Sequence, residues 1–432
     1  MSTTTLSASE IDGRGFDAVV VGAGPAGSTA AIALLRNGFK VALVDRYSFP
    51  RDKACGDVIG PKARILLQRI GVVAESSISI GDMDLELPGR LVVHLPAAPG
   101  VDFDGEGMAV PRYVFDNLLF QTALKEGAIY VKGRASFPSP GHGYNPHVVK
   151  VKDGESTVSM TCTFLIGADG ANSSVAERFS LLDRSSVLFG FAVRRYVRGH
   201  VRTPIISILE EGGKLFPGYG WAFPSIDGQL NVGVGVGVLG ERSKGSRATK
   251  SLDPYIKMLA AREDVEIEDS FEVSEKSQMG GWLKMGLAGT KPGRYRVLLV
   301  GDAAGLVNPL QGEGIASAIE SGFLAAESIM ASPSDPASLY EQRLSDMELS
   351  FAKGASLLHR SALRYPGPLL PALKVLGRAA QNKRVASAFG IYLNGLGVSA
   401  GSIEGSALAR VAQGFLSAMD KTIELKGHFG SL

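Results

Sequence analysis

The sequence predicts an α/β fold in which one parallel sheet is interrupted twice by strand-rich insertions and followed by a helical region. Near the N-terminus, residues 16–45 have the order strand, glycine-rich turn, helix and strand of a βαβ unit. Two later apolar runs, 164–166 and 295–300, have the continuous hydrophobic character of strands buried on both faces. Segments between them alternate apolar and polar residues, as half-buried strands do. A sheet built from separated pieces, with a second sheet inserted, accounts for all three observations.

The first turn, Gly22-Ala-Gly-Pro-Ala-Gly27, follows an apolar strand and opens an alanine-rich helix. Gly22 permits the tight turn, Gly24 lets the backbone approach a pyrophosphate, and Gly27 allows close packing of helix on strand. Pro25 and Ala26 lie at the helix N-terminus, whose N–H groups attract an anion. Strand, turn and helix in this order predict a dinucleotide site.

The second strand, residues 40–45, ends in Asp45, 18 residues beyond Gly27. A carboxylate at this place accepts hydrogen bonds from a ribose 2′-hydroxyl and disfavours NADP. Arg46 follows it and is a candidate to lie against the adenine.

Two later signatures extend this site. Gly167-Ala-Asp169-Gly170 follows one buried run, and Asp169 either touches the ligand or holds its turn by bonding backbone amides. Gly301-Asp302 follows the other, and Asp302 can accept hydrogen bonds from ribityl hydroxyls, cap a helix, or do both. The three signatures together indicate FAD.

A long helix is predicted from about residue 316 to 330, opened by Gly314 and Ile315. Its positive N-terminal end favours negative charge at the N1/O2 edge of a reduced isoalloxazine. This placement predicts a redox enzyme whose flavin is held reduced.

The composition limits the class of protein to which this chain can belong. A chain of 432 residues with 45% hydrophobic content predicts two or three domains, and the net charge of +2 excludes a typical nucleic-acid binder. The two cysteines, Cys55 and Cys162, and the six histidines show no metal-binding spacing and no disulfide framework, so no metal is expected. Residues 1–15 lack a secretory signal, and no run of about 18 apolar residues occurs. A cytoplasmic location is expected.

Domain boundaries follow from this pattern of pieces. We expect a discontinuous FAD-binding domain (16–80, 111–185 and 291–335), a substrate-binding domain (81–110 and 186–290) and a helical C-terminal region (336–432).

The glycine signatures resemble those of the flavoprotein group that includes aromatic hydroxylases, halogenases and geranylgeranyl reductases, and the resemblance covers most of the chain. Residues 49–57, Phe-Pro-Arg-Asp-Lys-Ala-Cys-Gly-Asp, look like the cysteine loop of the geranylgeranyl reductase family. Residues 218–224, Gly-Tyr-Gly-Trp-Ala-Phe-Pro, followed by Gly233-x-Gly235, look like its substrate signature. Within this family the chain is most similar to reductases of the prenyl tail of menaquinone. The resemblance implies a Rossmann-like FAD-binding domain, p-hydroxybenzoate hydroxylase-like, with an inserted antiparallel substrate sheet.

The substrate motif suits an oily chain. A prenyl tail binds by burying methyl and methylene groups, worth about 25 cal/mol per Å². Tyr219, Trp221 and Phe223 are two residues apart, so on a strand they face one side and can line an apolar slot. The alternative is a core stripe of the insert domain. Pro224 and the glycines Gly233 and Gly235 favour a binding slot, because they weaken a simple core strand.

An isolated alkene is a poor hydride acceptor, so its reduction needs hydride from flavin N5 and a proton on the neighbouring carbon. Cys55 lies in a polar loop and is the leading candidate near that event, as proton donor, gate or flavin contact. Water relayed through Tyr219 or Asp57 is a rival, and Tyr219 and Trp221 are further candidate catalytic residues. By family resemblance Arg112 reaches the FAD phosphates or ribityl chain; the alternative is a solvated cation at a helix start.

The resemblance implies a prenyl reductase of the EC 1.3 type, acting on a menaquinone tail or a geranylgeranyl lipid. The alternative is an FAD-dependent aromatic monooxygenase, which shares the fold and all three signatures. A halogenase is disfavoured because its Trp-x-Trp-x-Ile-Pro motif would need Trp at Tyr219 and Ile at Phe223. A flavin-containing binding protein without turnover leaves the cysteine loop unexplained.

The remaining expectations concern partners. No second nucleotide motif is visible, so electrons are expected from transiently bound NAD(P)H or a small redox protein. Residues 351–403 contain no Asp or Glu and interleave basic with apolar residues. This pattern predicts peripheral attachment to the inner face of the cell membrane; an amphipathic helix covering the FAD domain is the alternative.

Overall fold

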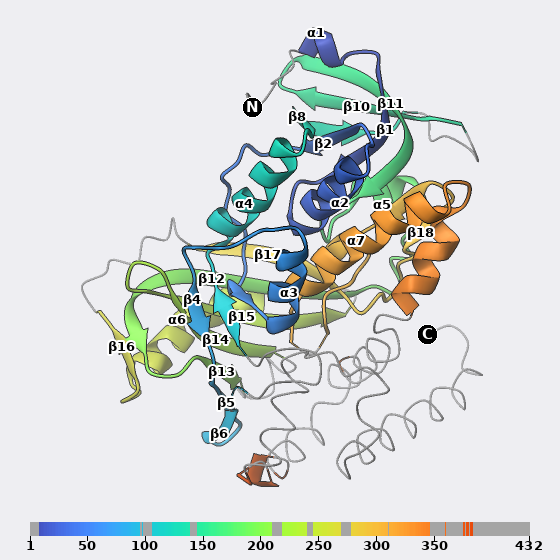
Figure 1. Cartoon of the computed structure of the whole chain (residues 1–432). Coiled ribbons are helices and arrows are strands. Elements are labelled where there is room, and N and C mark those ends of the chain that lie inside the picture. The colour runs from blue at the N-terminus through green and yellow to red at the C-terminus, as the bar shows by residue number, and fades with distance from the viewer. Residues whose placement is uncertain are drawn as a thin grey trace, which may run out of the picture.

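The structure is a computed structural model, shown in Figure 1. Two sheets lie at an angle to each other, and helices α2, α4 and α7 cover the upper one (Figure 1). The structure describes residues 8–95, 97, 106–138, 145–209, 218–239, 245–268, 278–309, 311–345, 359, 375, 377–379 and 381–382.

The first sheet carries the βαβ unit. Its described strands run in the order β18 (Gly293–Arg294), β19 (Val297–Leu299), β11 (Ser156–Gly167), β1 (Arg14–Val21), β2 (Val41–Asp45) and β8 (Ile129–Lys132). Beside this path, β10 (His147–Asp153) pairs with β11, and β9 (Arg134–Ser136) pairs with β10. The pairs β1–β11, β1–β2, β2–β8 and β11–β19 are parallel. The turns after β1, β11 and β19 therefore meet at one edge of the sheet.

Both faces of this sheet are buried, which explains the continuous apolar runs. On β1, Ala18 and Val20 pack toward the helices, whereas Val19 and Val21 pack toward the opposite layer. The described helices are α1 (Ala8–Ile11), α2 (Pro25–Arg36), α3 (Pro61–Arg69), α4 (Arg112–Lys125), α5 (Ser174–Arg178), α6 (Ser246–Ala260) and α7 (Ile315–Ala331), with a short 3₁₀ turn η4 (Gly301–Ala303). Residues 336–345 are also helical.

The second sheet is formed by segments that the first sheet leaves out. Its strands run in the order β16 (Val265–Ile267), β12 (Leu188–Val201), β15 (Gln229–Leu239), β14 (Gly218–Ser225), β13 (Ile205–Ile208), β5 (Met83–Leu87) and β6 (Leu91–Leu95), with β17 (Met279–Met285) beside β12. All pairs are antiparallel except β13–β5, which is parallel. A small third sheet has the strand order β3 (Val58–Ile59), β7 (Gly107–Ala109) and β4 (Ile78–Ile80). Along the chain, its strands come between strands of the two large sheets.

Strand alternation divides this sheet into two different faces. On β15 the valines pack against α6, for example Val232 and Val234, whereas the glycines lie on the other face. The same face of β14 carries Tyr219, Trp221 and Phe223. The glycine face is the one that borders the cavity described below.

The sequence predicts that the segment from 185 to 290 is strand-like, and helix α6 within it differs from this prediction. Its buried residues Ala248, Leu252, Tyr255 and Leu259 recur at helical spacing and cover the valine face of the sheet. A period near 3.6 was therefore present in the sequence, between two stretches of strong alternation.

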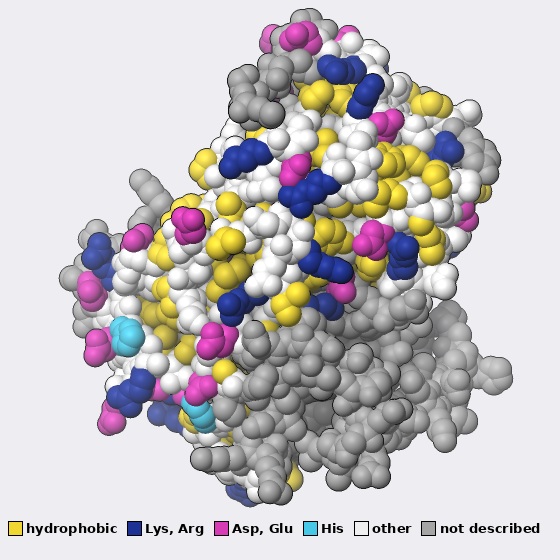
Figure 2. Space-filling view, viewed as in Figure 1, with side chains coloured by type: hydrophobic (Ala, Val, Ile, Leu, Met, Phe, Trp, Pro, Cys, Tyr) yellow, Lys and Arg dark blue, Asp and Glu magenta, His cyan; other side chains and the backbone are white. Residues whose placement is uncertain are grey.

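The face of the molecule in Figure 2 shows basic and acidic side chains interspersed, with no field of one sign. Among the described residues on that face, this distribution agrees with the small net charge. Among the described residues, the helices are too short or too polar to cross a bilayer. The basic stretch 351–403 lies almost wholly outside the described residues, and membrane attachment stays a prediction.

Candidate functional site

One cavity of 1230 Å³ joins the two predicted sites. It runs from the turn after β1 to the aromatic face of β14. The residues predicted for the cofactor that line it are Gly22, Gly24, Pro25, Ala26, Asp45, Arg46, Arg112, Asp169, Asp302, Gly314 and Ile315. Those predicted for catalysis or substrate that line it are Cys55, Tyr219, Trp221, Phe223 and Gly235. Gly27, Gly301, Pro224 and Gly233 lie off the lining.

The turn after β1 needs two of its glycines for space inside the protein. Gly22 has φ +108°, and a Cβ there would lie 2.2 Å from the Ala168 carbonyl oxygen. A Cβ on Gly27 would lie 1.8 Å from the Gly22 oxygen. At Gly24, with φ −74°, a Cβ would meet only the Arg51 Nη2 atom, at an ordinary 3.5 Å. The chain therefore leaves the space beside Gly24 open to the cavity.

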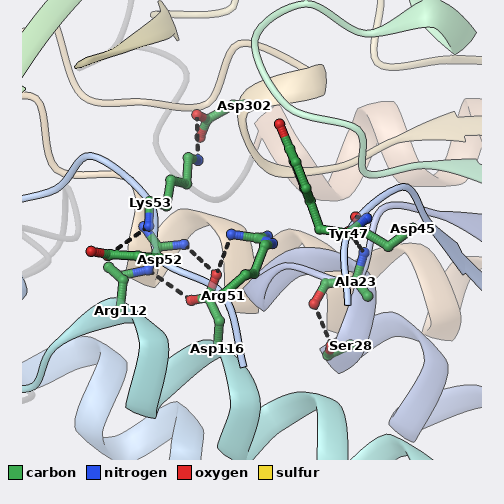
Figure 3. Close-up of polar contacts among 10 residues, drawn as sticks. All are labelled: Ala23, Ser28, Asp45, Tyr47, Arg51, Asp52, Lys53, Arg112, Asp116 and Asp302. Atoms are coloured by element: carbon green, nitrogen blue, oxygen red, sulfur yellow. Dashed lines mark hydrogen bonds and ion pairs between the residues drawn. The ribbon is translucent and has the colours of Figure 1, made fainter. Parts of the chain in front are cut away.

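Asp45 is buried beside this turn. Its Oδ2 accepts a hydrogen bond from the Ala23 backbone N–H at 2.8 Å, and its Oδ1 accepts one from the Tyr47 backbone N–H at 3.0 Å (Figure 3). These bonds hold the carboxylate on the cavity wall, and each oxygen keeps a lone pair for a further donor. The Arg46 guanidinium lies over the Tyr47 ring, 4.6 Å from its centroid.

Arg112 is not a solvated cation at a helix start. It is 4% exposed, and its guanidinium makes a two-pronged ion pair with Asp116 at 2.7 and 2.8 Å (Figure 3). Arg51 approaches the same carboxylate at 3.2 Å. Two guanidinium groups on one carboxylate leave net positive charge at the cavity wall, which suits a phosphate or an anion.

Asp302 and Asp169 are held differently. The Asp302 carboxylate pairs with Lys53 at 3.3 Å, which brings the cysteine loop to the end of β19 (Figure 3). Asp169 Oδ2 accepts from the Ser174 backbone and hydroxyl and from the Val175 backbone, so it caps α5 as the backbone-binding alternative predicts. Asp169 Oδ1 is buried and has no partner among the described residues.

These residues fit FAD. No described side chain caps the first turn of α2, so its N–H groups can meet a pyrophosphate at the cavity. Asp45 and Asp302 both line the cavity and are candidates for binding the ribose and ribityl hydroxyls. The N-terminus of α7 begins at Gly314 on the same cavity.

The far wall is aromatic and closely packed. The Trp221 indole is 4% exposed and lies over Gly233, where a Cβ would approach its Cζ2 atom to 2.1 Å. Phe223 packs beside it, and the Tyr219 hydroxyl donates a hydrogen bond to the Gln311 carbonyl oxygen. Burial, with Cys55 and Glu313 nearby, raises the pKa of Tyr219, so the phenol keeps its proton.

Cys55 is half-buried on the cavity wall, and its neighbour Gly56 packs against Phe223 and Trp221. The Arg112 guanidinium and the Asp57 backbone N–H lie near the thiol, and both favour its ionised form. Burial raises the pKa of the Cys55 thiol above its ordinary value, and Arg112 only partly offsets this. The thiol therefore carries a proton at neutral pH, beside a cation that favours its loss.

Behind this wall lies a polar cluster that includes Asp57, Asn231 and Tyr196. Asp57 is 1% exposed, is not part of the cavity lining, and has a left-handed backbone with φ 64°. Its Oδ2 accepts from the Tyr196 hydroxyl and, at 2.7 Å, from Asn231 Nδ2. Asp57 Oδ1 is buried without a partner among the described residues.

This burial predicts a pH effect on stability. Burial raises the pKa of Asp57 from 3.8 to about 6, against the hydrogen bonds from Tyr196 and Asn231. Between these values the folded chain holds a proton that the unfolded chain releases, so the free energy of unfolding falls as pH rises through this window. The shift of about two units corresponds to about 3 kcal/mol. Relative to wild type, Asp57→Asn should gain stability by about this amount between pH 4 and pH 7, measured by urea unfolding; parallel curves would contradict it.

The sequence did not indicate several residues of this site. They are Asp116, Tyr196 and Asn231. Asn231 lies on the same face of its strand as Gly233 and Gly235, and a polar residue among these glycines is a signal that points to it. His359 also lines the cavity, and burial lowers its pKa to about 4, so it is neutral. No local pattern distinguishes it.

Comparisons with known proteins agree with this geometry. Residues 16–338 match a family described as an FAD binding domain. The chain is 33% identical over 387 residues to a menaquinone reductase of Mycolicibacterium smegmatis, covering 88% of this chain and 91% of that protein. It is 30% identical to digeranylgeranylglycerophospholipid reductase 1 of Methanopyrus kandleri, covering 72% and 80%. A geranylgeranyl bacteriochlorophyll reductase-like protein of Thermoplasma acidophilum has the same fold, with TM-score 0.67, 20% identity and coverage of 88% and 96%.

Proposed function

Because the chain belongs to the geranylgeranyl reductase family of FAD-dependent oxidoreductases, we propose that it saturates isolated C=C bonds of a prenyl chain on a quinone or lipid. The observation that carries this proposal is the single cavity shared by the cofactor turn, Cys55 and an apolar wall. A menaquinone tail is the preferred substrate, because the menaquinone reductase resembles the chain over most of its length.

Reduced FAD, when bound, supplies a hydride to one carbon of the alkene. The protein must supply the proton and the surroundings that exclude water. In this proposal Cys55 Sγ holds the proton for the neighbouring carbon, and Arg112 stabilises the thiolate that remains. Tyr219 and Trp221 form the apolar wall that excludes water. Gly235, opposite Tyr219 in the β14–β15 pair, leaves room for the chain.

The cavity continues beyond Trp221 as an aliphatic arm, which we define as the lining residues Met83, Leu85, Leu87, Leu95, Ile206 and Ile208. Trp221 pairs with Ile206, and Ile206 pairs with Leu85, so the arm extends across β14, β13 and β5 on one face of the sheet. Aliphatic side chains at this place can bury isoprene units beyond the reduced bond.

The arm predicts a dependence on chain length. Replacing Leu85, which is 5% exposed, with Trp should shorten the arm and raise KM for long prenyl chains about tenfold. A short prenyl substrate should be affected much less. Leu85→Met preserves the volume and is the matched control. Steady-state kinetics on substrates of two tail lengths measures this, and an equal change for both would contradict the assignment of the arm.

Anaerobic turnover tests the function itself. The photoreduced enzyme should be reoxidised by a prenylated quinol, whose ring is already reduced and cannot take the electrons, and mass spectrometry should find quinol product heavier by two hydrogens per bond. The aromatic monooxygenase alternative requires oxygen and yields a hydroxylated product. No reoxidation by any prenyl lipid would remove the proposed function. Adding NADH, NADPH or a reduced ferredoxin to the same assay identifies the electron donor.

A further inference from the structure

Asn231 occupies a central place between the two halves of the site. It lies on β15 and is 1% exposed. Its Oδ1 accepts the Trp221 indole N–H at 2.9 Å. Its Nδ2 donates to the Cys55 carbonyl oxygen at 2.8 Å and to Asp57 Oδ2 at 2.7 Å. One amide thus uses its oxygen on the substrate sheet and both of its N–H groups on the cysteine loop.

We propose that Asn231 is the positioning residue of this site, which fixes the Cys55 loop relative to the Trp221 wall. The inference rests on the proposed function, because it assigns a role in placing the thiol against the alkene. Only an amide meets the requirement for one acceptor and two donors at this position: a carboxylate cannot donate, and an apolar side chain can do neither.

The surrounding contacts explain why a single side chain can have this effect. The loop is held by separate ion pairs at Asp52, to Arg194 of β12, and at Lys53, to Asp302. These pairs hold the loop before Cys55, whereas Asn231 holds the Cys55 carbonyl oxygen and shares the Asp57 carboxylate with the Tyr196 hydroxyl. Trp221 is already confined by Gly233, so its indole N–H offers a fixed direction. Loss of the amide should let the loop move while the sheet stays in place.

The test uses the FAD-loaded full chain and the variants Asn231→Leu and Asn231→Asp. In Asn231→Leu we expect Cys55 to react with iodoacetamide about tenfold faster, because the thiol becomes less buried. Cys162 is 1% exposed and should not react, and Cys55→Ala gives the blank. We expect kcat for a prenyl substrate to fall about tenfold to a hundredfold while KM changes little, because binding depends on apolar area.

Asn231→Asp provides a rescue. Its carboxylate faces Asp57, so it cannot donate while ionised, but on protonation it regains one donor. Because iodoacetamide reacts with the thiolate, alkylation slows in every variant as the pH falls, so each rate is compared with wild type at the same pH. The ratio of the Asn231→Asp alkylation rate to the wild-type rate, and the same ratio for kcat, should return toward one as the pH is lowered. If Asn231→Leu does not fold, Asn231→Asp alone tests whether Asn231 is a positioning residue.

Ser207→Ala is the matched control. Ser207 is also 1% exposed in the same sheet, but it bonds to Glu86 and Tyr255 on the face away from the cavity. It should lower the melting temperature without changing Cys55 alkylation. If both Asn231 variants lower only the melting temperature and leave alkylation and kcat unchanged, Asn231 is not a positioning residue. Because alkylation needs no substrate, this result is independent of whether wild type reduces a prenyl chain.

Discussion

Gly27→Ala should yield protein without bound flavin. The added Cβ would lie 1.8 Å from the Gly22 carbonyl oxygen and 3.0 Å from the Ala168 Cβ. The first contact is with backbone, so α2 must move away from the end of β1. We expect a loss of about 3 kcal/mol or more in stability, because overpacking of this kind shifts backbone and not a flexible side chain. Flavin absorbance per polypeptide and thermal unfolding measure the two effects.

Substitutions at two other glycines distinguish an effect on folding from an effect on cofactor binding. Gly38 has φ +82° with nothing within 4 Å of an added Cβ, so Gly38→Ala should cost only about 1–2 kcal/mol and keep the flavin. Gly24→Val should fold like wild type but bind FAD weakly, because only the cavity is filled. Full flavin occupancy in Gly24→Val would show that the cofactor does not approach this turn.

Cys55→Ala should lower prenyl reduction about a hundredfold to ten-thousandfold, the range for loss of a general acid. The thiol that donates must be protonated, and burial raises its pKa above the ordinary 9.0. Wild-type turnover should therefore be flat through neutral pH and decline only above about pH 9. The variant should lack this alkaline decline. Anaerobic single-turnover reoxidation across pH measures both the rate and its profile.

Cys162→Ala is the matched control for this experiment. Cys162 is 1% exposed in the core on the far side of the first sheet, so its loss should reduce stability and leave turnover unchanged. If Cys55→Ala retains turnover within about tenfold and keeps the alkaline decline, the proton comes from another source. A water held by the Tyr219 hydroxyl would then be the first alternative.

The family and its FAD were predictable from sequence because the information is local. The glycine turn, the acid after β2 and the two later glycine signatures each occupy a few residues, and their backbone requirements do not depend on distant partners. The comparisons confirm the family and the cofactor. The alternation of Tyr219, Trp221 and Phe223 also follows from strand geometry alone, and all three do line the cavity.

Helix α6 differs from the strand-like structure that the surrounding sequence predicts. Its apolar spacing is helical, but it lies between segments that alternate apolar and polar residues, so a prediction for the whole segment 185–290 favours strands. The predicted domain boundaries, electron donor and membrane attachment stay predictions.

Only the tertiary structure decided how the polar groups at the cavity pair with one another. Arg112 is predictable as a cation, but its pairing with Asp116 and its contact with Cys55 depend on how α4 packs against the cysteine loop. Lys53 meets Asp302 across 249 residues, and Asn231 meets Cys55 across 176. Such contacts arise from the register and packing of separate sheets, and no short pattern in the chain encodes them. The sequence determined the cofactor and the alternation of the three aromatic residues, because each is a local backbone or side-chain pattern. Packing alone brought Arg112 beside the thiol and joined the Cys55 loop to Trp221 through Asn231.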